Sequence, residues 1–300
     1  MKKFIVAILK AALFTFVFLG IQLVVTLILS IFALLIEEIW GYVTGDYSMG
    51  LSQMDNLVSA VTFVTGAVTL LFLWFVFAVR GKSFSREVRW HRMPLAGRAM
   101  LGPVECGFGM SILSSFVLAL IPFPEAWYAS YDESMELLMS GNPILLTAAT
   151  VIAAPFVEEV VFRGLVYTRL CRGMKTWIAA ILSAVIFGLV HGTLLHLVFT
   201  VPMGLMLCLF YEKYRSLWAP ILLHMSFNLA GTMLGYYSLE SAAPIIVLIA
   251  IGVYLTVLGL LSMRWYRREH IVCHVSAPTD PTNPENPNEM SSVQIDSCHL

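Results

Sequence analysis

The chain has 300 residues, of which 59% are hydrophobic and 12% are charged, and its formal net charge is −1. Soluble proteins have about 45–50% apolar and about 25% charged residues. The composition therefore argues against a soluble enzyme, and the near-neutral charge argues against a nucleic-acid-binding protein. The five cysteines form no CxxC pair, which argues against a disulfide framework or a zinc–thiolate site.

Eight apolar runs along the chain have the length expected of helices in a membrane. A helix that crosses about 30 Å of hydrocarbon needs about 20 mostly apolar residues. The expected spans are 4–36, 57–79, 100–122, 143–170, 176–191, 194–212, 217–235 and 244–263. The sequence thus predicts an all-α, polytopic membrane protein with a transmembrane domain over residues 1–269.

The apolar run from Trp177 to Tyr211 is too long for one ordinary span and short for two. Lys175 precedes it and Lys213 follows it, so the chain is expected to enter the membrane and return to the same side. The turn must then fall at residues 191–193. Two short helices that meet at a histidine and a glycine favour irregular backbone facing a protein cavity rather than lipid.

The distribution of lysine and arginine predicts the orientation. Residues 37–56 and 123–142 carry carboxylates and neither lysine nor arginine, whereas residues 80–99 carry six basic residues. The positive-inside rule then places both termini in the cytoplasm. The proline-rich residues 270–300 are expected to form a disordered cytoplasmic tail. Because the compact chain has no organelle signal, we expect a multi-pass protein of a bacterial cytoplasmic membrane.

Three charged residues lie within the fourth span. A charge at the bilayer centre costs about 2.5–3.5 kcal/mol on insertion scales, so Glu158, Glu159 and Arg163 are functional candidates; the alternative is a structural ion pair that locks two helices. Glu159 and Arg163 are four residues apart and can pair on one helix face. Glu158 points about 100° away and is the freer carboxylate, as a general base requires.

Polar side chains lie at similar depth in two further spans. Phe187 and His191 are four residues apart in one span, and His224 and Asn228 are four apart in another. Each of these polar residues alone is typical of a hydrogen bond between membrane helices. Together with the charged residues they supply the parts needed for hydrolysis within a cavity. His196 is interpreted as a residue at the outer membrane interface.

In chain order these residues form three motifs, Glu-Glu-x-x-x-Arg at 158–163, Phe-x-x-x-His at 187–191 and His-x-x-x-Asn at 224–228. The ordered set resembles the CPBP (CAAX protease and bacteriocin-processing, Abi) family of intramembrane endopeptidases, and the type II CAAX prenyl proteases in particular. The resemblance covers about 143–235. It implies about eight helices that enclose an intramembrane catalytic cavity. It also implies cleavage of a membrane-associated substrate, of CAAX or leader-peptide type, by glutamate-activated water.

The resemblance also implies a role for each motif residue. Glu158 would activate the water with the help of His191, while His224 and Asn228 would stabilise the oxyanion. The supporting residues would be Glu159, Arg163 and Phe187. No cofactor is implied. In a zinc-dependent alternative Glu158, His191 and His224 would be the ligands, since two histidines and a glutamate are a known catalytic set, although no HExxH is present.

The expected partners are membrane lipid and a membrane-associated or prenylated peptide or protein, without nucleic acid. Two other functions stay open. A transporter could also use carboxylates at the membrane midplane, but it would be expected to show repeated spans, and the sequence has none. A non-catalytic scaffold or immunity protein could keep the motifs on the same fold.

Overall fold

The computed structural model describes residues 2–45, 56–90, 98–139, 141–235 and 242–275. Within these ranges all regular structure is helical, which confirms the all-α prediction. The helices, with η marking π-helix, are α1 (Lys2–Thr44), α3 (Leu57–Val79), α4 (Phe84–Glu87), α5 (Arg98–Leu120), α6 (Glu125–Met139), α7 (Pro143–Thr147), η1 (Ala148–Ala153), α8 (Ala154–Glu159), η2 (Val160–Tyr167), α9 (Thr168–Cys171), α10 (Thr176–Leu189), α11 (Leu194–Tyr214), α12 (Trp218–Gly235) and α13 (Ala242–Val275).

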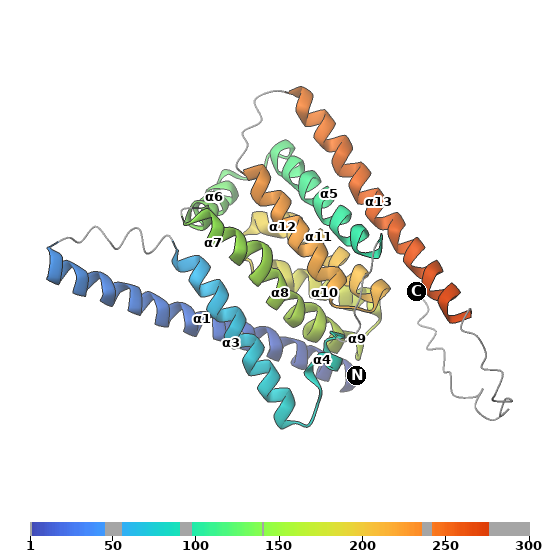
Figure 1. Cartoon of the computed structure of the whole chain (residues 1–300), viewed down its shortest axis with the longest axis horizontal. Coiled ribbons are helices and arrows are strands. Elements are labelled where there is room, and N and C mark those ends of the chain that lie inside the picture. Colours follow the sequence, from blue (N-terminus) through green and yellow to red (C-terminus); the bar gives the residue numbers. More distant parts are fainter. Residues whose placement is uncertain (1, 46–55, 91–97, 140, 236–241, 276–300) are drawn as a thin grey trace.

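The helices form three layers, which Figure 1 shows from one side. Helices α1 and α3 pack together on one flank, and α5 and α13 on the other. Between them lie α10, α11, α12 and the continuous helical segment from α7 to α9. The segment α7–α9 contacts α1 and α3 on one side and α12 on the other. All three sequence motifs therefore lie in the middle layer.

Six helical stretches in the described residues are long and apolar enough to cross a membrane, and the chain is an integral membrane protein. All eight predicted spans correspond to helices. Two of these helices are not long or apolar enough to cross a membrane by themselves. Helix α10 has only 14 residues, and α12 carries the polar residues His224, Ser226 and Asn228. Helix α10 and the turn that follows it carry the second motif, and α12 carries the third. Short or polar helices are tolerated at this depth where other helices, rather than lipid, surround them.

Small residues bring the outer layer of α5 and α13 close to the centre. A Cβ atom built on Gly109 of α5 would meet the backbone of Gly252 in α13, and one on Gly107 would meet Leu223 in α12. Membrane helices lack a hydrophobic drive toward each other, so such close backbone approach supplies the packing. Helix α5 therefore holds α12 on one face and α13 on another.

Three segments differ in detail from the sequence prediction. The stretch 123–142, expected to be a loop, contains the helix α6 (Glu125–Met139). This helix is anchored because the Tyr128 hydroxyl donates to the carbonyls of Leu118 and Ile121 at 3.0 and 2.9 Å. Helix α1 has 43 residues, about 65 Å at 1.5 Å per residue, so it extends well beyond one bilayer. Helix α13 continues to Val275, and the remaining predicted tail, 276–300, lies outside the described residues.

Candidate active site

The segment that carries the first motif is not a uniform α-helix. The short helix α8 lies between the π-helical segments η1 and η2. The amide of Ala154 donates to the carbonyl of Ala149, five residues earlier, as the wider π turn requires. Such turns are rare in proteins overall, and those that occur are often found at functional sites. Both glutamates of the first motif belong to α8, and Arg163 belongs to η2.

A proline in this segment leaves one backbone carbonyl without a donor from the helix, and a residue of the third motif supplies that donor. Because Ala154 donates to Ala149 and Pro155 has no N–H, the carbonyl of Thr150 is left for a partner outside the backbone ladder. The side-chain amide nitrogen of Asn228 donates to this carbonyl at 2.8 Å. Asn228 therefore joins α12 to η1, while its second N–H remains for another acceptor.

Glu159 is the fully enclosed carboxylate of the pair. Its side chain has 0% exposure, and its Oε1 accepts from Nη1 of Arg163 at 2.8 Å. The predicted ion pair between these residues is confirmed. The same Oε1 lies 2.9 Å from Nδ1 of His224, a contact that helix geometry alone did not predict. Glu159 therefore connects η2 to α12 and has no oxygen facing open space.

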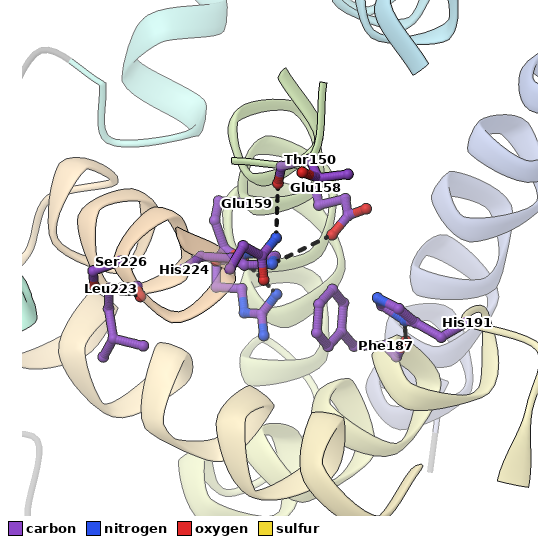
Figure 2. Close-up of polar contacts among 10 residues, drawn as sticks. Thr150, Glu158, Glu159, Phe187, His191, Leu223, His224 and Ser226 are labelled. Atoms are coloured by element: carbon purple, nitrogen blue, oxygen red, sulfur yellow. Dashed lines mark hydrogen bonds and ion pairs between the residues drawn. The ribbon is translucent and has the colours of Figure 1, made fainter. Parts of the chain in front are cut away.

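Glu158 has different surroundings, as Figure 2 shows. Its side chain keeps 19% exposure, and its Oε2 lies 3.8 Å from Nε2 of His224. His224 thus lies between the two carboxylates, with Nδ1 toward Glu159 and Nε2 toward Glu158. A separation of 3.8 Å is too long for a direct hydrogen bond. Of the two carboxylates, Glu158 is the one whose side chain remains partly exposed.

The ring of Phe187 organises the polar side chains around it. It is fully buried, and the guanidinium of Arg163 lies 4.3 Å from its centroid. The rings of His191 and His224 approach it at 4.7 and 5.7 Å between centroids, both in edge-to-face geometry. A cation held on an aromatic face away from water is stabilised by about 2 kcal/mol. Phe187 therefore supports the buried charge and fixes both histidines.

His191 lies at the end of α10, next to the predicted turn. Helix α10 ends at Leu189, α11 begins at Leu194, and Gly192 between them has φ +85°; the predicted reversal is confirmed. Nδ1 of His191 lies 2.8 Å from the carbonyl of Phe187. Since a carbonyl only accepts, Nδ1 carries the proton in the neutral ring and Nε2 keeps a lone pair. None of the hydrogen bonds of the described residues joins His191 to a carboxylate.

His196, interpreted from the sequence as a residue at the outer membrane interface, also lies next to the site. Its ring lies 5.9 Å from that of His191 and 4.9 Å from that of Tyr131 on α6. Its Nδ1 lies 2.6 Å from the hydroxyl of Thr193, which also caps the start of α11. The spacing to His191 gave no signal, because the chain reverses between the two histidines. This reversal brings His196 beside His191, and the helix α6 adds the contact with Tyr131.

The described residues include no group of three or more His, Cys, Asp and Glu side chains placed to hold a metal ion. Glu158 and His224 face each other, but His191, the third ligand of the zinc alternative, does not complete the set. The donor arrangement therefore does not fit the zinc-dependent alternative.

Comparisons with known proteins agree with the three motifs. Residues 140–230 match the family described as "Type II CAAX prenyl endopeptidase Rce1-like". The chain is 30% identical over 125 residues to the "Putative membrane peptidase YdiL" of Bacillus subtilis (strain 168), which is 41% of this chain and 51% of that protein. It therefore spans about half the length of that relative.

A second similar protein is the "UPF0177 protein YvdC" of Lactococcus lactis subsp. lactis (strain IL1403). It is 25% identical over 188 residues, which cover 61% of this chain and 68% of that protein. No solved structure matches the chain. The family resemblance predicted from the motifs is therefore confirmed over residues 140–230, the segment that matches the Rce1-like type II CAAX prenyl endopeptidases.

Proposed function

We propose that this protein is an intramembrane endopeptidase that hydrolyses a peptide bond of a membrane-associated protein or peptide with a water molecule activated by Glu158. One observation carries the proposal. Of the two adjacent carboxylates, Glu159 is bonded by Arg163 and His224, while Glu158 remains partly exposed beside His224. The family match and the name of the Bacillus relative support a membrane peptidase.

The reaction needs a base and then an acid, and Glu158 serves as both. Its carboxylate takes a proton from water while the water oxygen bonds to the carbonyl carbon of the substrate. His191 helps to orient the water through the lone pair on Nε2, which its bond to the Phe187 carbonyl leaves free. The C–N bond then breaks, and Glu158 returns the proton to the departing amine.

The oxyanion that forms in this step needs hydrogen-bond donors. Asn228 contributes its second amide N–H, the first being held by Thr150. His224 contributes Nε2–H when both ring nitrogens carry protons, with the Nδ1–H bonded to Glu159. A donor of this kind is worth about 2.7–4 kcal/mol in other hydrolases. Glu159, Arg163 and Phe187 hold these donors in place and take no proton.

The substrate is proposed to be a prenylated CAAX-type protein or a leader-peptide-type precursor. The test is to compare cleaved membrane peptides by mass spectrometry in cells that express the wild type or Glu158→Gln. The amide keeps the shape of the side chain but cannot accept the proton, so cleavage should be abolished while folded yield is kept. The matched control is Glu38→Gln on an exposed part of α1, which should leave cleavage unchanged.

Two results would overturn the mechanism. Full turnover by Glu158→Gln would remove Glu158 as the base. Loss of activity with a strong chelator, restored by added zinc, would show that the metal-free mechanism is wrong. If neither the wild type nor Glu158→Gln releases a cleaved membrane peptide, the protein is a non-catalytic member of the fold.

We further propose that both termini lie in the cytoplasm, as the alternation of basic and acidic segments predicts. The N-terminus of α1 lies close to Gly173, at the end of the molecule that also holds Arg172. Reporter fusions at residues 46, 90, 132 and 240 should read outside, inside, outside and outside. An inside reading at 132 would contradict this orientation.

A further inference from the structure

A second polar region lies away from the glutamates, where three helical segments end together. It is a hollow of about 520 Å³ between the α3–α4 turn, α9 and the last turn of α11, within the range of about 300–1,000 Å³ typical of ligand pockets. We call this hollow the basic pocket. Its charged lining consists of Lys82, Arg86, Arg89 and Arg172, with Glu87 and Glu212.

The two carboxylates of the basic pocket are already matched by arginines. Glu87 pairs with Arg169 at 2.9 Å and with Arg172 at 3.3 Å. Glu212 pairs with Arg89 at 3.2 Å and with Arg215 at 3.8 Å. Each acid is thus shared between two guanidinium groups, and the cluster keeps a surplus of positive charge.

Lys82 and Arg86 add to this surplus. Both are exposed at the mouth of the pocket, and neither forms an ion pair with a carboxylate in the part of the chain that the structure describes. Ammonium and guanidinium donors that converge on one hollow are the groups that bind phosphate. The basic pocket therefore offers a site for a phosphate-bearing anion.

One wall of the basic pocket is held in a strained conformation. Arg89 has φ +57°, which is rare for a residue with a side chain. Its guanidinium lies 4.7 Å from the ring centroid of Tyr211, whose hydroxyl donates to the carbonyl of Val88 at 3.4 Å. Val88 is fully buried against Gly164, where a Cβ atom would approach it at 2.8 Å. Strain maintained by packing in this way is frequent at ligand sites.

The surroundings of the basic pocket favour a lipid over a soluble phosphate. The last two turns of α3 lead directly into it and expose Phe72, Phe75 and Val79 on one face, with Val79 at 70% exposure. Acyl chains can lie along this apolar face while the head group reaches Lys82, three residues further on. Basic pockets at the ends of membrane helices are suited to anionic head groups.

From these features we propose that the basic pocket binds the phosphate of an anionic phospholipid, with Lys82 and Arg86 as its free contacts and Arg89 and Arg172 on the wall. This goes beyond the proposed peptidase function, because binding requires neither Glu158 nor a peptide. It assigns a specific lipid site to the end of the molecule opposite the His191 turn of α10 and α11.

The test measures lipid binding to the purified full-length protein in neutral detergent by native mass spectrometry. Phosphatidylglycerol should bind and phosphatidylcholine should not. Arg86→Gln should weaken phosphatidylglycerol binding about fivefold, since a basic group near a lipid surface contributes about 1 kcal/mol. The matched control is Arg80→Gln, an exposed arginine at the C-terminal end of α3 that does not line the pocket. It should change binding by less than about twofold, a threshold set well below the effect of one basic group.

Three outcomes would overturn the proposal. Equal weakening by Arg80→Gln and Arg86→Gln would show diffuse attraction to the surface rather than a pocket. Equal binding of the two lipids would show that the head-group charge does not determine binding to the pocket. Displacement of phosphatidylglycerol by glycerol phosphate or inorganic phosphate at matched concentration would assign the pocket to a soluble phosphate. The readout is binding, so loss of peptidase activity would not affect the result.

Discussion

Helix α1 and the segment α7–α9 are both long and apolar, but their environments differ. Of the 43 residues of α1 only six are buried, whereas all eight residues of η2 are buried. Helix α1 exposes leucines and isoleucines along most of its length, which suits contact with lipid. The segment α7–α9 instead encloses Glu159 and Arg163 at 0% exposure.

The two environments show where charge is tolerated in a membrane protein. Lipid chains cannot hydrogen-bond, so a charged side chain is stable at depth only where protein supplies its partners. Around Glu159 these partners are Arg163 and His224, with Phe187 beneath the guanidinium. Hydropathy identifies both regions as membrane helices, and only the enclosed one can carry chemistry.

The largest expected effect of a single substitution comes from breaking the enclosed ion pair. Arg163→Ala leaves the Glu159 carboxylate buried without its cation, which commonly costs about 3–5 kcal/mol. We expect a large loss of folded protein by size-exclusion chromatography in detergent and a lower unfolding temperature. The matched control is Arg215→Ala, because Arg215 is 47% exposed in its pair with Glu212 and such pairs contribute about 0–1 kcal/mol. Equal losses for both variants would show that burial does not distinguish them.

A smaller effect on stability is expected from Asn228→Ala. The substitution leaves the Thr150 carbonyl without its donor, and an unsatisfied buried acceptor costs about 1–3 kcal/mol. The same change removes a proposed oxyanion donor, so cleavage should fall by about 10²–10³. Asn228→Asp keeps the size of the side chain but also lacks both N–H groups, so similar losses in the two variants would assign the effect to the missing donors rather than to the lost volume. Unchanged unfolding temperature in both variants would contradict a structural role of the bond to Thr150.

The smallest effect is expected on the lipid-facing surface. Leu27→Ala on α1 replaces an exposed side chain, and lipid fills the space, so the free energy of unfolding should change by at most about 0.5 kcal/mol. Leu165→Ala in η2 is the matched control, because Leu165 is fully buried and a cavity there costs about 2–5 kcal/mol. Thermal unfolding in the same detergent measures both. A similar cost at the two sites would show that α1 packs against protein.

Local features of the site could be predicted from the sequence. The Glu159–Arg163 pair follows from a spacing of four residues, and the reversal at Gly192 follows from the basic residues on either side of the apolar run. Both are set by neighbours along the chain, and both agree with the structure. The helix ends between residues 57 and 235 also follow closely, because loss of hydrophobic character marks where each helix leaves its apolar surroundings, whereas α1 and α13 continue beyond their predicted spans.

Other features depend on contacts between distant segments and could not be predicted. The contact of His224 with Glu159 spans 65 residues, and helix periodicity gives no information over that distance. The contact of His196 with Tyr131 depends on α6, whose acidic residues predict a loop although Tyr128 and Tyr131 pack it against neighbouring segments. The π turns around α8 leave no trace in the hydrophobic pattern.

The bond between Asn228 and the Thr150 carbonyl also has a consequence for biosynthesis. A ribosome delivers the chain from the N-terminus, and the two partners are separated by 78 residues. When residues 143–171 first enter the bilayer, the carbonyl left by Pro155 has no donor, because α12 has not yet been translated. The first half of the protein is therefore inserted in an incomplete form. Its hydrogen bonding is completed only after translation has passed residue 228. The third motif therefore completes the helical segment that carries the first motif.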